Sequence, residues 1–379
     1  MSVVPPAENG TTIRTGLPGY CAAAENEASA ADSTSKQQRR FITGGPQERT
    51  LPAIIPLCKL RRMLRALAFL AACAFALEAG AQAFPAKPLR LVVGYPPGGS
   101  GDFLTRLIAD EMSKDLGTVV IVDNRPGAGG NIAAELVARA SADGYTVLNG
   151  NNHAINRTLY RSLPYDDKDF VPVTKIATGP TVIVVNNSSP VTSLQELIAF
   201  ARANPGKLFN AGAGYGSAPH LAAVLFESVA GVKFTSVQFK GGGPAAQSLL
   251  AGDTQVMFAT SPTVMGFVRS GRLRALAVSM RDGSPAVPGI PGSAQAGLPA
   301  YNYTFWFGLY VPAGTPAPIV RRLYAAAVKG LGKQEVKEKI AAQGMDATPS
   351  ASPEAFEADI KAEAPLLERV VRDSGAKVE

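Results

Sequence analysis

The stretch that decides the fold is residues 89–122, LRLVVGYPPGGSGDFLTRLIADEMSKDLGTVVIV. It begins with a compact apolar run, Leu89–Gly94, which is typical of a buried strand. A turn rich in glycine and proline follows, and Asp102–Leu116 then carries apolar residues at helical spacing. Val119–Val122 predicts a second strand. Strand, helix and strand joined by short links indicate a parallel sheet with crossover helices.

The same alternation continues along the chain. A helix over Ile132–Ala140 and a strand over Tyr145–Leu148 come next, and the extended segment Phe170–Asn186 leaves this first lobe. The pattern then restarts, with predicted helices over Leu194–Ala203, Ala218–Ala230, Ala245–Ala251 and Pro262–Ser270, and strands over Leu208–Ala211, Thr235–Phe239, Gln255–Ala259 and Leu273–Ser279.

A second extended run, Tyr301–Val311, can return the chain to the first lobe. Four or five helical segments are expected after Pro316, from Ile319 to about Val371. Two α/β lobes joined by two extended segments predict a hinged clamshell. In such sheets a ligand binds beyond the carboxyl ends of the strands, so we expect the site in the cleft between the lobes.

The composition is that of a globular protein without a strong charge bias. The 379 residues are 46% hydrophobic and 18% charged, and no apolar run reaches the roughly 18–20 residues that a spanning helix needs. The formal net charge is +7, but residues 84–379 hold 28 basic and 24 acidic side chains with no dense basic run. We therefore exclude nucleic acid as a partner.

Residues 63–83 are predicted to be a secretory signal peptide. Arginines precede Met63, Leu64–Leu77 is almost entirely apolar, and Ala81-Gln82-Ala83 provides a cleavage site. Because such a signal opens a chain, we expect translation to start at Met63 and residues 1–62 to be a non-structural extension. A functional disordered extension is the alternative.

All three cysteines, Cys21, Cys58 and Cys73, precede the predicted cleavage after Ala83. The mature chain then has no disulfide, zinc thiolate or thiol nucleophile, and we expect neither a metal nor a cofactor. Leu70-Ala71-Ala72-Cys73 also fits a lipoprotein cleavage box. A periplasmic protein is therefore predicted, with lipid anchoring at Cys73 as the alternative.

Four predicted strand-to-helix junctions are rich in glycine, proline and small polar residues. They are residues 95–102, 212–217, 240–244 and 259–262; in the last, Ser261 is placed as the N-cap and Pro262 as the first helical residue. Each offers backbone N–H groups at the positive end of a helix, and glycine lets a ligand approach closely. If the four helix ends converge, they form an anion site. The alternative is that glycine and proline only form the ordinary turns that precede these helices.

A catalytic centre is hard to assemble from this sequence. The only histidines are His153 and His220, their spacing does not suit a metal site, and no serine lies in a G-x-S-x-G motif. Each histidine is more simply a hydrogen-bonded structural residue, although His153 can reach the cleft. Asp102 is either a helix cap or an acceptor for a ligand group. Trp306 and Phe307 are interpreted as hinge contacts rather than a ligand platform.

Several motifs stand in order along residues 84–379. They are FPAKPLRL (84–91), YPPGGSGD (95–102), VDNRPGAGGN (122–131), DGYT (143–146), LPYD (163–166), GYGSAPH (214–220), KG (240–241), GRLRALA (271–277) and WFG (306–308). With them the chain resembles the Bug-type solute-binding proteins, the extracytoplasmic receptors of tripartite tricarboxylate transporters. The resemblance covers essentially all of residues 84–379.

The resemblance implies a type II periplasmic-binding-protein fold, in which two α/β lobes joined by two hinge segments close on a small carboxylate. It also implies that two facing loops pinch one carboxylate, partly through ordered water, and here these are Tyr95–Asp102 and Gly212–Ser217. Where the family often has an Asp-Asn pair, this chain has Ala259-Thr260. That departure argues against an amino-acid ligand and leaves dicarboxylates, tricarboxylates and aromatic carboxylates open.

Residues 84–185 and 304–379 are predicted to form lobe 1, and residues 186–303 lobe 2. The implied function is a non-catalytic, monomeric periplasmic receptor that captures a small carboxylate for integral-membrane transporter subunits. A ligand-sensing module for a membrane signalling partner and an α/β hydrolase or transferase are the alternatives. The residues expected to bind the ligand are Tyr95, Pro97, Gly98, Gly99, Ser100, Asp102, His153, Gly214, Tyr215, Gly216, Ser217, Lys240, Gly241 and Thr260.

Overall fold

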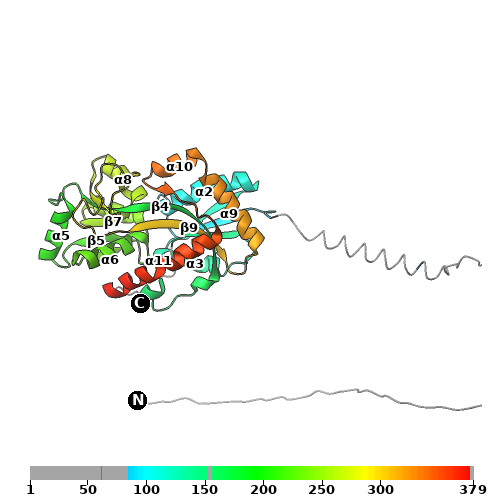
Figure 1. Ribbon diagram of the computed structural model, residues 1–379. Helices are drawn as coiled ribbons and strands as arrows, with labels where there is room; N and C mark the ends of the chain where they lie inside the picture. The colour runs from blue at the N-terminus through cyan, green and yellow to red at the C-terminus, as the bar shows by residue number, and fades with distance from the viewer. Residues whose placement is uncertain (1–60, 62–83, 152–155, 376–379) are drawn as a thin grey trace, which may run out of the picture. The chain divides into compact units, whose positions relative to one another are not determined.

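The computed structural model describes residues 61, 84–151 and 156–375, and the fold is formed by the last two ranges (Figure 1). The predicted signal peptide, residues 63–83, lies outside the described residues, as does His153. So does all of the predicted extension except Arg61. Among the described residues, no helix combines the length and the apolar character needed to cross a bilayer.

The first set of strands follows the prediction from residues 89–122. β1 (Leu89–Val93) pairs in parallel with β2 (Val120–Asn124) on one side and with β3 (Thr146–Gly150) on the other. Because β1 is a central parallel strand and almost fully buried, four of its five residues are apolar; Arg90, the exception, is half-buried and pairs with Asp123. The crossovers contain α2 (Ser100–Leu116), then η1 (Ala128–Gly130) and α3 (Asn131–Ala138).

The second set of strands repeats this arrangement. β5 (Phe209–Gly212) pairs in parallel with β6 (Thr235–Gln238) and with β7 (Val256–Thr260). The helices and the strand around them are α5 (Leu194–Ala203), α6 (Ala218–Ala230), α7 (Gly242–Ala251), α8 (Ser261–Arg269) and β8 (Leu273–Val278). The predicted limits of α5 and α6 are confirmed to the residue.

One long strand, β4 (Phe170–Asn186), joins the two sets. Its first half pairs antiparallel with β9 (Thr304–Pro312), which also pairs with β3, and its second half pairs antiparallel with β7 and β8. The strand order β2-β1-β3-β9-β4-β7-β5-β6 therefore places β4 and β9 between the β1–β3 lobe and the β5–β7 lobe (Figure 1). Two extended segments were predicted to connect the lobes; the residue limits given above for each lobe stay a prediction.

Within the described residues, three helices follow Pro316, so the expected count of four or five is wrong. They are α9 (Ala317–Leu331), α10 (Gln334–Ala341) and α11 (Pro353–Ser374), with β10 (Asp346–Ala347) before α11. α11 continues through Pro365 instead of breaking there. It packs against α6 and β4 and buries Phe356 and Leu367, and this burial offsets the backbone hydrogen bond that the proline removes.

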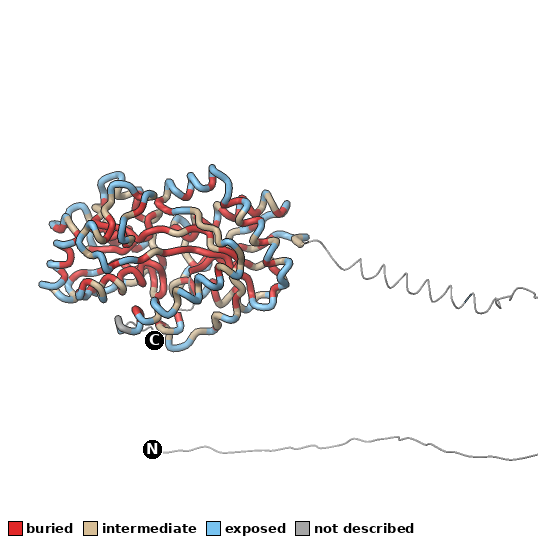
Figure 2. The backbone as a smooth tube through the Cα atoms, in the orientation of Figure 1, coloured by how far each residue is buried: buried red, intermediate tan, exposed pale blue. Residues whose placement is uncertain are grey.

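The strands form the interior and the helices the outer layer. In Figure 2 the central strands are buried, while the outer turns of the helices are exposed. All five residues of β7 are buried. Two short elements, α4 (Asn156–Leu159) and η3 (Asp167–Asp169), lie between β3 and β4. Four loops that leave the carboxyl ends of β1, β5, β6 and β7 lead directly into α2, α6, α7 and α8.

Candidate functional site

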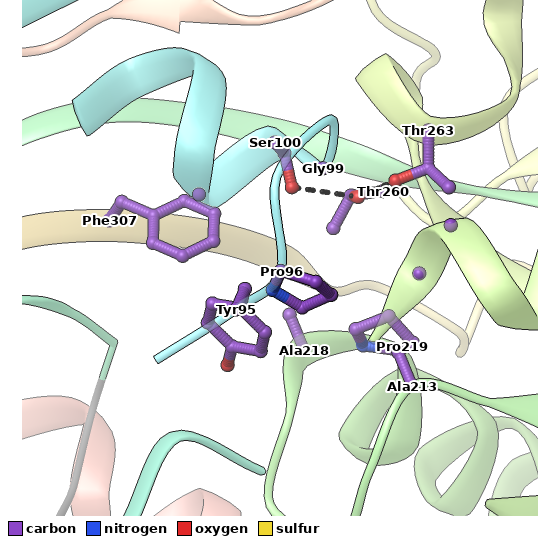
Figure 3. A pocket seen from close by; sticks show the side chains of 13 residues that line it. Tyr95, Pro96, Gly99, Ser100, Ala213, Ala218, Pro219, Thr260, Thr263 and Phe307 are labelled. Carbon is purple, nitrogen blue, oxygen red and sulfur yellow. Dashed lines mark hydrogen bonds between the residues drawn. The ribbon is translucent and has the colours of Figure 1, made fainter. Parts of the chain in front are cut away.

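The four predicted junctions converge on one cavity (Figure 3). The cavity contains about 400 Å³ of space between atoms, part of it open to solvent. Its wall comes from the β1–α2 junction, the β5–α6 junction and Phe307 of β9, through Tyr95, Pro96, Gly99, Ser100, Gly101, Ala213, Ala218 and Pro219. The β6–α7 and β7–α8 junctions complete it with Gly242, Gly243, Thr260 and Thr263.

The β1–α2 junction is shaped by Gly101. A Cβ atom there would lie 2.9 Å from Cδ2 of Tyr95 and 3.4 Å from Cε1 of Phe307, so glycine lets α2 begin directly against both rings. The two rings contact each other edge to face, with centroids 6.0 Å apart. Phe307 therefore forms part of the cavity wall, whereas the indole of Trp306 donates to Glu363 at 2.7 Å.

Three hydroxyl groups form a chain between the two lobes. Ser100 Oγ of α2 lies 3.0 Å from Thr260 Oγ1, which lies 2.9 Å from Thr263 Oγ1 of α8 (Figure 3). Three hydroxyls carry three protons and share two hydrogen bonds, so one proton remains for donation to a further acceptor. A carboxylate oxygen is a suitable acceptor for it.

Three of the four helices that point at the cavity begin without a side-chain cap. The N-cap residues are Gly99 of α2, Gly241 of α7 and Thr260 of α8. At none of them does the side chain of the N-cap residue accept a hydrogen bond from a backbone N–H group of the first turn. The first N–H groups of a helix have no partner within the helix. No lining residue is Lys, Arg, Asp or Glu. Helix ends and hydroxyls are thus the groups that can stabilise a negative charge here.

Ser261 is not the N-cap of α8, as the sequence had suggested; Thr260 is. Ser261 is the first helical residue, and its buried hydroxyl donates to the carbonyl oxygen of Gly344 at 2.7 Å. That bond ties α8 to the turn before β10, far along the chain. Thr260 is left with its hydroxyl directed at Ser100.

Asp102 holds the β1–α2 junction in place and does not line the cavity. Its carboxylate accepts hydrogen bonds from the backbone N–H of Gly98 at 3.1 Å, from Arg106 at 3.1 Å and from Asn124 at 2.9 Å. Burial opposes ionisation, but these partners outweigh it and hold the pKa of the Asp102 carboxyl below its usual range. Pro97 and Gly98 are exposed and also lie outside the lining.

The predicted ligand-binding residues of the β5–α6 junction, Gly214, Tyr215, Gly216 and Ser217, do not line this cavity. Gly214 and Tyr215 line a neighbouring cavity instead, and Gly216 lines neither. The fully buried Ser217 is the N-cap of α6: its hydroxyl donates to the carbonyl oxygen of Gly214 at 2.6 Å and accepts from the N–H of His220. The hydroxyl of Ser217 is therefore already used inside the protein.

The β6–α7 junction brings the two lobes together. Gly241 has a φ of +148°, and a Cβ atom there would lie 2.6 Å from Cδ of Pro96, so glycine permits the close approach of the loops. Lys240 lines the neighbouring cavity together with Gly214 and Tyr215. Gly242 and Gly243 line the first cavity in place of the predicted pair.

His220 has a structural role. It is buried, its Nδ1 accepts the N–H of Gly216 at 3.3 Å, and burial lowers the pKa of its imidazole to about 4. In residues 84–151 and 156–375 no group of three or more His, Cys, Asp or Glu side chains is placed to hold a metal ion. His153, the other candidate, lies outside the described residues.

Sequence reasoning named Tyr95, Gly99, Ser100 and Thr260 individually among the lining residues, and its junctions include Pro96, Gly101, Ala213, Gly242 and Gly243. It did not place Ala218, Pro219, Thr263 or Phe307 at the site. Thr263 carried a signal, because a residue three positions after Thr260 faces the same side of a helix. Small apolar residues of the β5–α6 junction carried none, since nothing in their own sequence distinguishes a cavity wall from core.

Known proteins match this chain over most of its length. Residues 104–363 match a family described as the tripartite tricarboxylate transporter family receptor. Protein BugT of Bordetella pertussis is 36% identical over 315 residues, which are 82% of this chain and 96% of BugT.

Two solved structures share the fold. The R. palustris protein Rpa4515, solved with adipate, has a TM-score of 0.75 and 35% identity, covering 78% of this chain and 100% of that one. The periplasmic binding protein BugD has a TM-score of 0.74 and 29% identity, again covering 78% of this chain and 100% of that one. Together with the strand order, these similarities confirm the predicted periplasmic-binding-protein fold.

Proposed function

This chain belongs to the tripartite tricarboxylate transporter receptor family, and on that basis we propose that its cavity binds one carboxylate group of a small organic acid. The observation that carries the proposal is the convergence of four strand-to-helix junctions on a cavity without a charged side chain. A similar protein, Rpa4515, was solved with adipate, which supports a carboxylate as the ligand class.

The carboxylate accepts hydrogen bonds from the hydroxyl chain and from first-turn N–H groups of α2, α7 and α8. Hydrogen bonds to an ionised acceptor are stronger than neutral ones, and the nearby apolar surfaces of Tyr95, Pro96 and Phe307 keep bulk water away. No acidic residue lines the cavity to compensate an ammonium group. The site therefore discriminates against amino acids and favours dicarboxylates, tricarboxylates or aromatic carboxylates.

The rest of the proposed function follows from the family. The protein is exported to the periplasm, binds its ligand as a monomer when the two lobes close, and presents the closed form to integral-membrane transporter subunits. It performs no chemistry on the ligand, so incubation with a bound carboxylate should yield no product.

Thermal unfolding of the purified protein with mono-, di- and tricarboxylates and amino acids tests this function. A ligand that binds only the folded state stabilises it by RT ln(1 + [L]/Kd), about 2.7 kcal/mol at a hundredfold excess over Kd. We expect one class of carboxylate to raise the midpoint with concentration and the matching amino acids to leave it unchanged. If no carboxylate raises the midpoint, the proposal is wrong.

Two threonine variants show whether the cavity is the site. Thr260→Val keeps the shape of the side chain but removes the hydroxyl between Ser100 and Thr263, and should weaken carboxylate binding by about tenfold. Thr254 is also buried and pairs with the hydroxyl of Ser248 at 3.3 Å, outside the cavity. Thr254→Val should lower stability and leave the affinity unchanged; equal loss of affinity in both variants would place the ligand elsewhere.

A further inference from the structure

A second cavity adjoins the first on the other side of Tyr95. It contains about 600 Å³ of space between atoms, part of it open to solvent, and it shares Tyr95 and Ala213 with the first cavity. The hydroxyl of Tyr95 donates to the carbonyl oxygen of Gly129 at 3.2 Å, which holds the ring between the two spaces. Tyr95 and Ala213 thus belong to the walls of both cavities, which are neighbours.

The second cavity differs from the first in charge. Lys240 is the one charged side chain among its lining residues, and none of them is acidic. Lys240 is exposed, and its ammonium group makes no ion pair or hydrogen bond with any described residue. An anion that enters therefore meets a cation whose charge is not already compensated, and it meets no carboxylate that would repel it.

Gln238 adds an unused donor to the same wall. Its Oε1 accepts the backbone N–H of Gly214 at 3.0 Å, which fixes the carboxamide, while its Nε2 is buried without a hydrogen-bond partner. A buried donor without an acceptor costs free energy, and an oxygen that reaches it recovers that cost. Lys240 and Gln238 therefore both line this cavity, one with an uncompensated charge and the other with an unpaired amide donor.

We propose that the Lys240 cavity binds the distal carboxylate of a linear dicarboxylate. The proximal carboxylate of this ligand lies against the hydroxyl chain of Ser100, Thr260 and Thr263. The methylene groups between the two carboxylates pass beside Tyr95. This inference rests on the proposed function, because it takes the first cavity as the seat of one carboxylate. The inference narrows the ligand class from dicarboxylates, tricarboxylates and aromatic carboxylates to linear dicarboxylates, because a single ammonium group pairs with one further carboxylate.

Isothermal titration of the purified full-length protein with matched ligands tests the proposal. Succinate, glutarate and adipate are each compared with the monocarboxylate of the same length, butanoate, pentanoate or hexanoate. Lys240→Gln should weaken binding of the preferred dicarboxylate by about tenfold and change that of its monocarboxylate by less than about twofold. Lys240→Arg keeps the charge and should retain dicarboxylate binding, which shows that a loss in Lys240→Gln does not come from misfolding.

Lys207→Gln is the matched control. Lys207 is exposed and precedes β5, whereas both cavities lie at the other end of that strand. The control removes the same charge from the same lobe and should leave all affinities unchanged.

The possible failures are distinguishable. If the wild-type protein binds carboxylates, but Lys240→Gln affects both members of a pair equally or neither, the Lys240 subsite is refuted and the carboxylate receptor stands. Preference of the wild type for monocarboxylates would refute it as well. If the wild type binds no carboxylate of any kind, the proposed function itself is wrong.

Discussion

Asp102, Ser217 and His220 are buried polar residues whose hydrogen bonds stay within the protein. Asp102 and Ser217 were expected to contact the ligand, yet each already has internal partners that fix a loop beside the cavity. Such residues keep the loop N–H groups oriented when no ligand is bound, which lowers the free-energy cost of organising the site on binding. The predicted contacts Tyr95, Gly99, Ser100 and Thr260 line the cavity directly.

His220 makes stability depend on pH. Its pKa in the folded protein is about 4, against an ordinary value of 6.5, so the unfolded chain takes up the proton first as the pH falls. The free energy of unfolding should therefore decrease between pH 6.5 and 4, by at most about 1.4 kcal/mol per pH unit from this group. His220→Asn keeps an acceptor for the N–H of Gly216 and cannot titrate, so it should show a shallower decrease.

Urea unfolding of wild type and His220→Asn across this pH range measures the effect. Every other titratable group, His153 included, is common to both proteins, so the difference in slope isolates His220. Equal slopes would contradict the shifted pKa.

At the scale of elements, the turn 127–130 before α3 meets the β5–α6 loop. All four residues of this turn have positive φ, from +47° at Ala128 to +135° at Gly127. The hydroxyl oxygen of Tyr160 lies 3.1 Å from the carbonyl oxygen of Ala128 and 3.2 Å from that of Tyr215. A Cβ atom on Gly129 would overlap the carbonyl oxygen of Tyr215, so the two loops can touch because Gly129 has no side chain.

Gly129→Ala should therefore disfavour the contact between the turn 127–130 and the β5–α6 loop, and weaken ligand binding by about tenfold or more. Gly231→Ala is the matched control, because Gly231 has the same φ of +64° but nothing within 4 Å of a Cβ atom. Each substitution should cost about 1 kcal/mol of stability through the left-handed backbone. Ligand affinities measured by calorimetry separate the effect on binding from the effect on stability. Similar affinities in both variants would show that the loop contact does not support binding.

At the scale of the whole molecule, β4 and β9 connect two lobes that touch around the cavity. The contacts across it include Ser100 with Thr260, Pro96 with Gly241, and Gly129 with Tyr215. α11 packs against both α6 and β4. Bending at the connecting strands β4 and β9 would separate the lobes and break these contacts around the cavity.

Small-angle scattering of the purified protein should detect this motion. We expect the radius of gyration to decrease when a bound carboxylate is added at saturating concentration, since the ligand stabilises the closed arrangement. An amino acid that fails to bind serves as the control and should leave the scattering unchanged. Identical profiles with and without a ligand that binds by calorimetry would mean that the protein binds without closing.

Most of the fold can be predicted from local patterns in the amino-acid sequence. Apolar runs, helical spacing and glycine or proline at the boundaries located the parallel strands, and α5 and α6 matched to the residue. The extended segment Phe170–Asn186, predicted to be a strand in part, is β4 over its whole length. These features depend on neighbours within a few positions. The same local signals marked the four loops that form the cavity, because strand ends and helix starts are local properties. After Pro316 the structure has fewer helices than expected, and α11 continues through Pro365 because its burial outweighs that local break signal.

Which residue of each loop faces the cavity depends on contacts between segments that are distant in the sequence. The side chain of Ser261 points away from the cavity because its hydroxyl donates a hydrogen bond to the carbonyl oxygen of Gly344, 83 residues later. Thr260 lines the cavity in its place. Phe307 joins the wall because β9 runs beside β3, which brings its ring to Tyr95. Side-chain direction in a loop is set by such long-range partners, and no local pattern of residues encodes them.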